Sequence, residues 1–479
     1  MDIKRNLTLL TDLYELTMMN GYLKENKQDE VVIFDVFFRQ NELITYSLAA
    51  GLEQAIEYIL NLSFDREDID YLESLKIFGS DFLNYLKNFK FTGDVYSVPE
   101  GTMVFPGEPI LTVKAPVMEA QLIETAILNI INHQTLIASK AAKIRYSAGS
   151  DNVMEFGLRR AQGPDAGIYG SRASVIGGCN STSNVLAGQI FDIPVSGTHA
   201  HSWVMSFPTE YEAFKAYADT YPDATLLLVD TYDTLKSGIP NAIKVFDELK
   251  AKGKKPLGIR IDSGDLAYLT KKARQMLDNA GYPDAIICAS GDLDEKLIQS
   301  LKLQGAKINS WGIGTKLITS ADMPALGGVY KLAGVVNSDG SITPKIKVSE
   351  TTAKITNPGF KKVMRIYDKK TGKAEADLIA LHDEKFDQSK PLTITHPTET
   401  WKKITFTDYE IKELSVKIIE NGKLVYKFPK VKEIASFAKG EMASFWDEYL
   451  RLDRPHIYKV DLSDKLLALK TDMLSKIRK

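Results

Sequence analysis

Between about residues 150 and 330, short apolar runs rich in β-forming residues alternate with stretches of helical spacing. The expected strands are 153–156, 193–197, 225–229, 257–261, 285–289 and 308–313. Helices are expected to begin near Gly170, Thr209, Thr234, Leu266 and Leu293. This alternation predicts parallel strands joined by crossover helices, which both a doubly wound sheet and a barrel contain.

The ends of these strands distinguish the two folds, because nearly all of them run into polar, glycine-bearing sequence. They read F-G-L-R-R, S-G-T-H-A-H-S, V-D-T-Y-D, R-I-D-S-G-D, A-S-G-D and W-G-I-G-T. Barrels collect their chemistry from the C-terminal ends of many strands, whereas a doubly wound sheet concentrates it at one switch point. We therefore expect an α/β fold with an irregular, TIM-like (β/α) barrel over residues 151–335.

The 479 residues are more than one core usually holds, so further units are expected on both sides of the barrel. Residues 1–150 predict an α+β domain with a strand over 31–38, hammerhead-like strands between 93 and 116, and a long helix over 117–147. Residues 336–479 predict a small region whose strands complete the N-terminal domain, followed by a helical tail.

The overall charge and the cysteines limit the possible partners and compartments. With 60 Lys and Arg against 62 Asp and Glu, the formal net charge is −2, which weighs against nucleic acid as a partner. The two distant cysteines, Cys179 and Cys288, suit a reducing compartment. No apolar run has membrane-spanning length and the N-terminus has no long apolar segment, so we expect a cytoplasmic protein.

Two neighbouring strand ends carry glycine turns typical of a phosphate site. Gly312, Gly314 and Thr315 follow one strand, and Gly291 and Asp292 follow the strand before it. Glycines let backbone N–H groups approach a phosphate, and barrels place phosphate sites at two adjacent strand ends. A single such turn would more often be an ordinary strand–helix connection, but the adjacent pair favours phosphate binding.

Four aspartates follow two other strands. Asp233 and Asp265 precede helices and are interpreted as helix N-caps. Asp230 and Asp262 come directly at the strand ends, where a carboxylate suits a ribose hydroxyl or Mg²⁺ held together with a pyrophosphate.

Arginines and histidines complete the set of candidate residues. Arg260 lies within an apolar strand, where it needs either a structural carboxylate or an anionic ligand, and Arg159 and Arg160 follow another strand. His199 and His201 form an H-x-H pair, but the chain has only six histidines and the barrel region offers no third. A zinc site therefore lacks ligands, and a role for His201 as nucleophile or phosphate acceptor is favoured.

Six motifs, in this order, resemble those of the nicotinate phosphoribosyltransferases, which are barrel-type enzymes of NAD biosynthesis. They are L-L-T-D-L-Y-E-L-T-M (9–18), E-F-G-L-R-R-A-Q-G-P-D (155–165), T-S-N-V-L-A-G (182–188), G-T-H-A-H-S, I-R-I-D-S-G-D and W-G-I-G-T. The resemblance covers about the first 360 residues well and the remainder loosely. The family pattern has methionine where this chain has His199.

This resemblance implies an ATP-coupled ligase of the pentosyltransferase (glycosyltransferase) type. It would form nicotinate mononucleotide and pyrophosphate from nicotinate and phosphoribosyl pyrophosphate, the first step of NAD salvage from nicotinate. Mg²⁺ would be the cofactor, with ATP and phosphoribosyl pyrophosphate as co-substrates. The enzyme would be a phosphoprotein, because His201 matches the histidine that the family phosphorylates.

The resemblance also implies roles for individual residues. Phe156 would stack on one face of the pyridine ring and Tyr14 of a second subunit on the other, which makes the active form a homodimer with shared sites. Arg260 would hold the nicotinate carboxylate. Asp230 and Asp262 would contact the ribose and the Mg²⁺-pyrophosphate. The 5-phosphate would be held by Arg159, Gly291, Asp292, Gly312, Gly314 and Thr315.

Substrate choice is expected to depend on Ser183 and Asn184. Relatives that use nicotinamide carry an aspartate in this neighbourhood, whereas a serine or an asparagine can donate a hydrogen bond to a carboxylate. The alternatives are nicotinamide or quinolinate phosphoribosyltransferase, an H-x-H metal hydrolase, and a non-catalytic ligand sensor on the same scaffold.

Overall fold

The computed structural model describes residues 5–40, 45–351 and 354–477. The chain divides into two compact units. The first unit contains Met1–Leu136, Ala325–Pro429 and Ser436–Lys479, and the second contains Ile137–Pro324 and Lys430–Ala435. In the described part of the chain, no helix is both long enough and apolar enough to cross a membrane.

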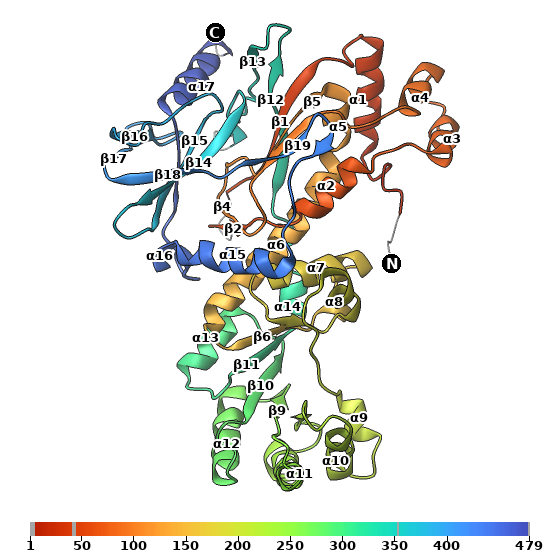
Figure 1. Cartoon of the computed structure of the whole chain (residues 1–479), viewed down its shortest axis with the longest axis vertical. Helices are drawn as coiled ribbons and strands as arrows, with labels where there is room; N and C mark the ends of the chain where they lie inside the picture. Colours follow the sequence, from red (N-terminus) through yellow and green to blue (C-terminus); the bar gives the residue numbers. More distant parts are fainter. Residues whose placement is uncertain (1–4, 41–44, 352–353, 478–479) are drawn as a thin grey trace. The chain divides into compact units, whose positions relative to one another are not determined.

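The second unit is built on a six-stranded, all-parallel sheet with the order β7-β6-β11-β10-β9-β8 (Figure 1). The strands are β6 (Asn152–Glu155), β7 (Ser181–Thr182), β8 (Leu226–Leu228), β9 (Gly258–Ile261), β10 (Ile286–Gly291) and β11 (Ser310–Ile313). Five of the six predicted strands are confirmed as the parallel strands β6, β8, β9, β10 and β11, whereas β7 was not expected.

Helices cover one face of this parallel sheet. They are α10 (Glu210–Thr220), α11 (Ile239–Ala251), α12 (Leu266–Asn279) and α13 (Glu295–Leu303). Val229, Ile259 and Ile287 pack with residues of α10 to α12 in one buried cluster. Asp233 and Asp265 accept backbone hydrogen bonds at the starts of their helices, so their predicted capping roles are confirmed.

The expected strand 193–197 is wrong as a regular strand. Val195 makes one parallel bridge to Thr182, and Pro194 has no N–H to donate to a ladder. A few residues later, His199 Nε2 accepts a hydrogen bond of 3.2 Å from the backbone N–H of Leu228 in β8. Segment 193–199 thus contacts both edge strands of the sheet, while no strand ladder joins β7 to β8 in the described residues.

The first unit contains a seven-stranded sheet in the order β13-β12-β1-β5-β3-β19-β20. Its strands are β1 (Val31–Phe38), β3 (Asp94–Ser97), β5 (Leu111–Pro116), β12 (Gly328–Val336), β13 (Ile342–Pro344), β19 (Val416–Glu420) and β20 (Lys423–Leu424). The strand predicted over 31–38 is confirmed as β1. A two-stranded sheet, β2 (Ser47–Leu48) with β4 (Met103–Val104), also belongs to this unit.

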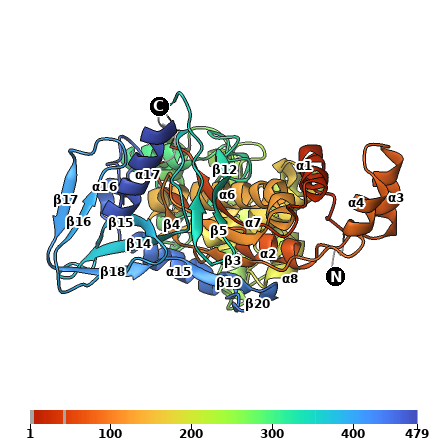
Figure 2. The same ribbon diagram turned by 90° about the horizontal axis from the view of Figure 1, so that it is seen from above.

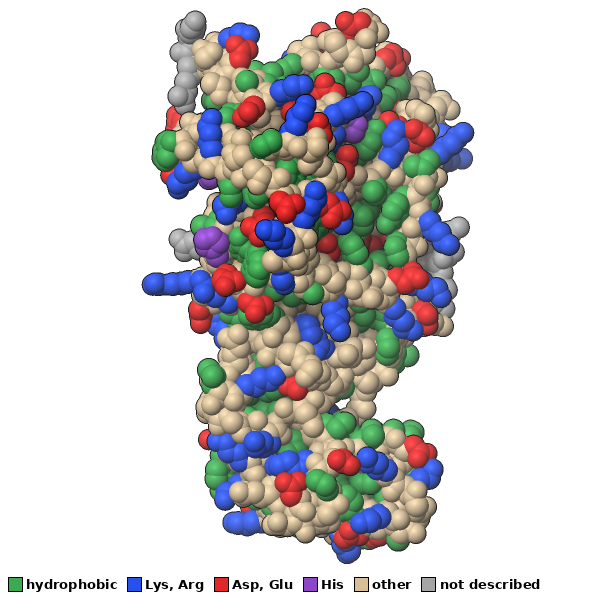
Figure 3. All heavy atoms as spheres, turned by 60° about the vertical axis from the view of Figure 1, so that its left-hand side comes forward, with side chains coloured by type: hydrophobic (Ala, Val, Ile, Leu, Met, Phe, Trp, Pro, Cys, Tyr) green, Lys and Arg blue, Asp and Glu red, His purple; other side chains and the backbone are tan. Residues whose placement is uncertain are grey.

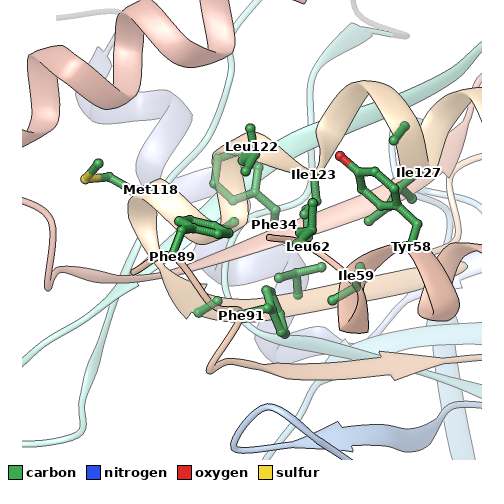
Figure 4. Packing of buried hydrophobic residues seen from close by; sticks show 14 of the residues in the cluster. Phe34, Tyr58, Ile59, Leu62, Phe89, Phe91, Met118, Leu122, Ile123 and Ile127 are labelled. Atoms are coloured by element: carbon green, nitrogen blue, oxygen red, sulfur yellow. The ribbon is translucent and has the colours of Figure 1, made fainter. Parts of the chain in front are cut away.

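An apolar cluster fills the core of the first unit. Phe34 of β1 packs with Tyr58 and Phe89, as Figure 4 shows. The neighbouring helices are α1 (Leu13–Lys24), α2 (Leu52–Leu60), α3 (Arg66–Ser74), α4 (Ser80–Leu86), α5 (Val117–Leu122) and α6 (Glu124–Ala148). The single helix expected over 117–147 is therefore two helices, which separate at Ile123.

The C-terminal part of the chain forms another sheet of the first unit, with the order β17-β16-β21-β15-β14-β18. Its strands are β14 (Lys361–Asp368), β15 (Ala374–Leu381), β16 (Leu392–Thr395), β17 (Lys403–Phe406), β18 (Tyr409–Glu413) and β21 (Lys459–Leu462). Figure 2 shows β16 and β17 along the outer edge of this sheet.

The expected helical tail is only partly correct. It contains α15 (Val431–Ala443), α16 (Asp447–Leu450) and α17 (Asp464–Ile477), but β21 lies between the last two helices. β21 pairs in parallel with β15, and its last two residues, Asp461 and Leu462, are both buried.

Candidate active site

Strand register decides which side chains of the second unit share a face. Arg260 of β9 is opposite Leu228 of β8 and Cys288 of β10, and Ser290 is opposite Gly312. Successive residues of a strand point to opposite faces, and the helices cover the face that carries Val229, Ile259 and Ile287. We call the other face the inner face. Its members include Met154, Leu226, Leu228, Arg260, Cys288, Ser290 and Gly312.

The predicted aspartates come together at the C-terminal edge of this inner face. Asp230 Oδ2 accepts hydrogen bonds from the Asp262 backbone N–H at 2.9 Å and from Ser263 Oγ at 2.7 Å. Asp262 Oδ1 in turn accepts from Ser290 Oγ at 2.5 Å. The second oxygen, Asp230 Oδ1, is buried without a partner in the described part of the chain. A buried acceptor of this kind is suited to a ligand or a metal ion.

Arg260 extends into the same region, and its side chain is 14% exposed. One terminal nitrogen, Nη1, donates to Thr198 Oγ1 and to the His199 carbonyl, and the other lies 3.8 Å from Asp262 Oδ1. Arg260 Nε is buried and bonded to none of the described residues. A guanidinium with donors left over fits an anionic ligand better than a purely structural ion pair.

The ring of Phe156 explains one of the predicted phosphate glycines. A Cβ on Gly312 would lie 2.7 Å from two ring carbons of Phe156, so only glycine allows the ring to pack against β11. Gly291 has a φ of +112°, and a Cβ there would lie 2.8 Å from the carbonyl oxygen of Asp262. Gly291 therefore allows the close approach of the neighbouring strand end, and Gly312 makes room for the Phe156 ring.

The remaining predicted phosphate residues lie close to these turns in the sequence. Gly314 precedes the short helix α14 (Thr315–Ile318), and Thr315 is half-buried. Asp292 is exposed directly after β10. Arg159 lies in the 3-10 helix Leu158–Arg160, is exposed, and has no side-chain partner among the described residues.

Ser183 and Asn184 follow β7, and the structure gives them different surroundings. Asn184 caps α8 (Val185–Phe191), because its Oδ1 accepts from the Ala187 N–H at 3.2 Å while its Nδ2 donates to the Gly167 carbonyl at 3.2 Å. With 1% exposure and both ends engaged, Asn184 has an internal role that the sequence reasoning missed. Ser183 is half-buried, which leaves it as the accessible donor of this pair.

The two histidines of the H-x-H pair differ as well. His201 begins α9 (His201–Met205), is half-buried, and places Nδ1 3.0 Å from Thr231 Oγ1, the residue after Asp230. His199 is 7% exposed, and its Nε2 is occupied by the Leu228 N–H. Burial, together with the charge of Arg260, lowers the pKa of His199 to about 4. His199 is thus a neutral structural residue, which removes half of the zinc pair that the metal-hydrolase alternative requires.

Lys140 has a role that the sequence pattern did not suggest. It lies on α6, and it is only 4% exposed. Its Nζ contacts Glu295 Oε2 at 2.8 Å and also binds Asp322. Glu295 begins α13 and Asp322 follows α14, so Lys140 connects the segments that continue from the two glycine turns.

Neither cysteine is positioned as a nucleophile. Both are free and buried, and burial raises the pKa of Cys179 to about 12 and that of Cys288 to about 11. Within the described residues, no group of three or more His, Cys, Asp and Glu side chains is arranged to hold a metal ion.

Tyr14 belongs to the first unit, where it lies on α1 with 46% of its surface exposed. Partial burial and a hydrogen bond with Glu15 raise its pKa, so the phenol remains protonated at neutral pH. Tyr14 thus presents an exposed, uncharged aromatic side chain on α1.

Comparison with known families covers almost the whole chain. Residues 9–132 match the nicotinate phosphoribosyltransferase N-terminal domain, residues 152–365 match the nicotinate phosphoribosyltransferase family, and residues 360–470 match its C-terminal domain. The chain belongs to the nicotinate phosphoribosyltransferase family. It is therefore a member of an enzyme family, and the resemblance inferred from the six motifs is confirmed.

Individual relatives agree with this family assignment. The nicotinate phosphoribosyltransferase of Bacillus subtilis is 47% identical over 474 residues, which cover 99% of this chain and 96% of that protein. The human enzyme is 32% identical over 519 residues, covering 96% of this chain and 95% of the human protein.

Solved structures share the fold. The crystal structure of human nicotinic acid phosphoribosyltransferase matches with a TM-score of 0.85 at 29% identity, over 97% of this chain and all of that one. A nicotinate-nucleotide pyrophosphorylase from Pyrococcus furiosus has a TM-score of 0.67 at 22% identity over 92% of this chain and 96% of that one, which shows a shared fold.

The buried, neutral His199 generates a prediction about stability and pH. Its pKa is about 4 in the folded state against about 6.5 unfolded, so only the unfolded state takes up a proton between these values. The free energy of unfolding should therefore fall by up to about 3 kcal/mol as the pH drops through this window. His199→Met should lose this component, as measured by urea unfolding near pH 7 and near pH 4.5. An equal pH dependence in both proteins would show that His199 is not held neutral.

Proposed function

We propose that this nicotinate phosphoribosyltransferase forms nicotinate mononucleotide and pyrophosphate from nicotinate and phosphoribosyl pyrophosphate, as the first step of NAD salvage from nicotinate. The observation that carries the proposal is the set of groups at the C-terminal edge of the inner face. It combines an aromatic ring, an arginine with an unpartnered Nε, a carboxylate with an unpartnered oxygen, and two glycine turns. These groups match a flat ring, an anionic substituent, a ribose and a phosphate, respectively.

The ring end of the site would be formed by Phe156, Ser183 and Arg260. The pyridine ring would lie against Phe156, while Arg260 and the accessible Ser183 hydroxyl would bind the nicotinate carboxylate. The 5-phosphate would bind at the two glycine turns with Thr315, and Arg159 would add a positive charge from its exposed position.

The chemistry requires positioning more than proton transfer. The pyridine nitrogen attacks the anomeric carbon while the bond to pyrophosphate breaks, and the nucleophile has no proton to lose. No general base is then needed, and catalysis depends on holding the ring in line and stabilising charge on both sides of the anomeric carbon. Asp230 and Asp262 would orient the ribose hydroxyls, with the unpartnered Asp230 Oδ1 as one acceptor.

Magnesium fits the same two carboxylates. The unpartnered Asp230 Oδ1 is an oxygen acceptor of the kind that Mg²⁺ uses, and Mg²⁺ typically binds one or two protein carboxylates together with substrate phosphates. Asp230 and Asp262 would hold it, and when bound it would neutralise charge on the leaving pyrophosphate.

Coupling to ATP would go through His201. Its Nδ1 is oriented by Thr231, which leaves Nε2 to attack the γ-phosphorus of ATP with release of ADP. Water later cleaves the N–P bond, which releases inorganic phosphate and regenerates the imidazole. The phosphorylated residue would add negative charge beside Thr231 and Asp230 and thereby change how the site binds its substrates.

Three further features of the protein belong to this proposal. Segment 193–199 would complete an irregular barrel, since it contacts both β7 and β8. The active form would be a homodimer, with Tyr14 of a second subunit covering the pyridine ring. The enzyme would act in the cytoplasm on small molecules alone. On the face shown in Figure 3, basic and acidic side chains are interspersed, which suits such substrates better than a nucleic acid.

Substrate identity is tested by comparing three pyridines. With Mg²⁺ and phosphoribosyl pyrophosphate, nicotinate should release pyrophosphate, and more rapidly when ATP is present. Nicotinamide and quinolinate should be poor substrates, because the first lacks the carboxylate that Arg260 and Ser183 bind and the second adds another. Pyrophosphate release is the measurement, and faster turnover of nicotinamide than of nicotinate would contradict the assignment.

The phosphohistidine role predicts a selective loss. His201→Ala should retain a basal, ATP-independent rate but lose the stimulation by ATP and the ³²P label transferred from γ-labelled ATP. His456→Ala, which changes an exposed histidine of the first unit, is the matched control and should behave like the wild type. Full ATP stimulation of His201→Ala would exclude the role.

A further inference from the structure

We propose that Glu155 is a positioning residue that fixes the pyridine-binding side of the site. It would hold Phe156 and Ser183 in register with each other through one buried carboxylate. This inference rests on the proposed function, because it assigns Glu155 to the binding of the ring rather than of the phosphoribosyl group.

Glu155 is the last residue of β6, and its side chain is completely buried. It directly precedes Phe156, but because side chains alternate along a strand it points to the opposite face. Because it is buried on that face, it is not placed to bind the substrate. In the sequence it has only the signal of a strand residue.

The two oxygens of Glu155 accept hydrogen bonds from three separate elements. Oε1 accepts from the backbone N–H of Gly157, in the turn that directly follows Phe156. Oε2 accepts from Ser171 Oγ at 2.9 Å and from Thr182 Oγ1 at 2.5 Å. Ser171 lies on α7 (Pro164–Ile176), and Thr182 is the last residue of β7, directly before Ser183.

The same hydroxyls extend the connection to the loop that carries Ser183. Thr182 Oγ1 accepts from the Asn184 backbone N–H at 3.0 Å, and Ser171 Oγ lies 3.3 Å from Asn184 Nδ2. In addition, the Ser183 N–H donates to the backbone carbonyl of Glu155 at 2.9 Å. Glu155 is therefore hydrogen-bonded to Gly157, which follows Phe156, to Thr182, which precedes Ser183, and through its backbone carbonyl to Ser183 itself.

The carboxylate has no basic partner among the described residues, so its burial is balanced by these donors alone. Such an arrangement is sensitive to the number and direction of its donors, since a buried polar group left unpaired costs about 1–3 kcal/mol. Glutamine has nearly the same shape, but it would turn an N–H₂ group towards donors. If that group faced Gly157, two donors would meet, and the turn that carries Phe156 would have to move.

The test is steady-state kinetics of Glu155→Gln with each substrate varied in turn. The KM for nicotinate should rise about tenfold or more, as expected for the loss of one buried hydrogen bond, while the KM for phosphoribosyl pyrophosphate changes little. Thr182→Val removes one hydroxyl donor without altering the carboxylate, and it should shift the nicotinate KM in the same direction by a smaller factor. It serves as the informative variant if Glu155→Gln does not fold.

The matched control is Asp151→Asn, which lies just before the other end of β6. Asp151 Oδ2 accepts from Trp311 Nε1 at 3.0 Å and contacts Lys302 Nζ at 2.9 Å, so this change also removes a carboxylate that binds a neighbouring strand. Asp151→Asn should lower the melting temperature, and it should not raise the KM for nicotinate more than the KM for phosphoribosyl pyrophosphate.

The outcomes distinguish this inference from the proposed function. A wild-type enzyme that turns over nicotinate, together with an unchanged nicotinate KM in Glu155→Gln or Thr182→Val, would overturn the role of Glu155 alone. If Glu155→Gln changed the KM for nicotinate and the KM for phosphoribosyl pyrophosphate equally, as Asp151→Asn does, the role would also be overturned. Equal changes would indicate a general structural role. A wild-type enzyme that does not use nicotinate would overturn the proposed function, and this inference with it.

Discussion

The parallel register of β8, β9, β10, β11 and β6 is the constraint on which the rest of the site depends. Because paired residues of neighbouring strands share a face, the position of Arg260 opposite Leu228 and Cys288 determines that it points away from the helices. A shift by one residue would move Arg260 into the buried cluster with Ile259 and Ile287, where its charge would be unpaired.

Short polar contacts then connect the strand ends to one another. Asp230 reaches from one strand end to the backbone of the next, and Asp262 reaches on to Ser290. At the end of β6, Glu155 connects the turn at Gly157 to α7 and β7. A Cβ at position 291 would lie too close to the Asp262 carbonyl oxygen, and a Cβ at position 312 would lie too close to the Phe156 ring, so both positions need glycine. Functional side chains are thus held by short hydrogen bonds to the backbone and side chains of neighbouring segments.

Much of this arrangement follows from sequence, because strands and helix starts have local causes. The apolar runs around β6, β8, β9, β10 and β11 were predictable from their β-forming residues, and the capping roles of Asp233 and Asp265 from their place before helices. The position of Asp230, Arg260 and Asp262 at the same edge followed from their common place at strand ends. The two-residue strand β7 was too short to give a periodic signal.

Other features depend on contacts between segments that are distant in sequence. His199 looked like half of a metal pair, but the backbone of β8 occupies its ring nitrogen. Asn184 looked like a substrate ligand and proves to be a helix cap, and the burial of Lys140 beside Glu295 and Asp322 has no signal in the local sequence. In the tail, β21 forms because β15 offers an edge for pairing, a partner that no local pattern reveals.

The most direct test of the active-site assignment is a crystal structure of the protein with nicotinate mononucleotide. The pyridine ring should lie against Phe156 with its carboxylate within hydrogen-bonding distance of Arg260 Nε, and the 5-phosphate should contact the backbone N–H groups at Gly291 and near Gly314. A nucleotide bound elsewhere, with Arg260 Nε and Asp230 Oδ1 still without partners, would contradict the assignment of the inner-face edge as the active site.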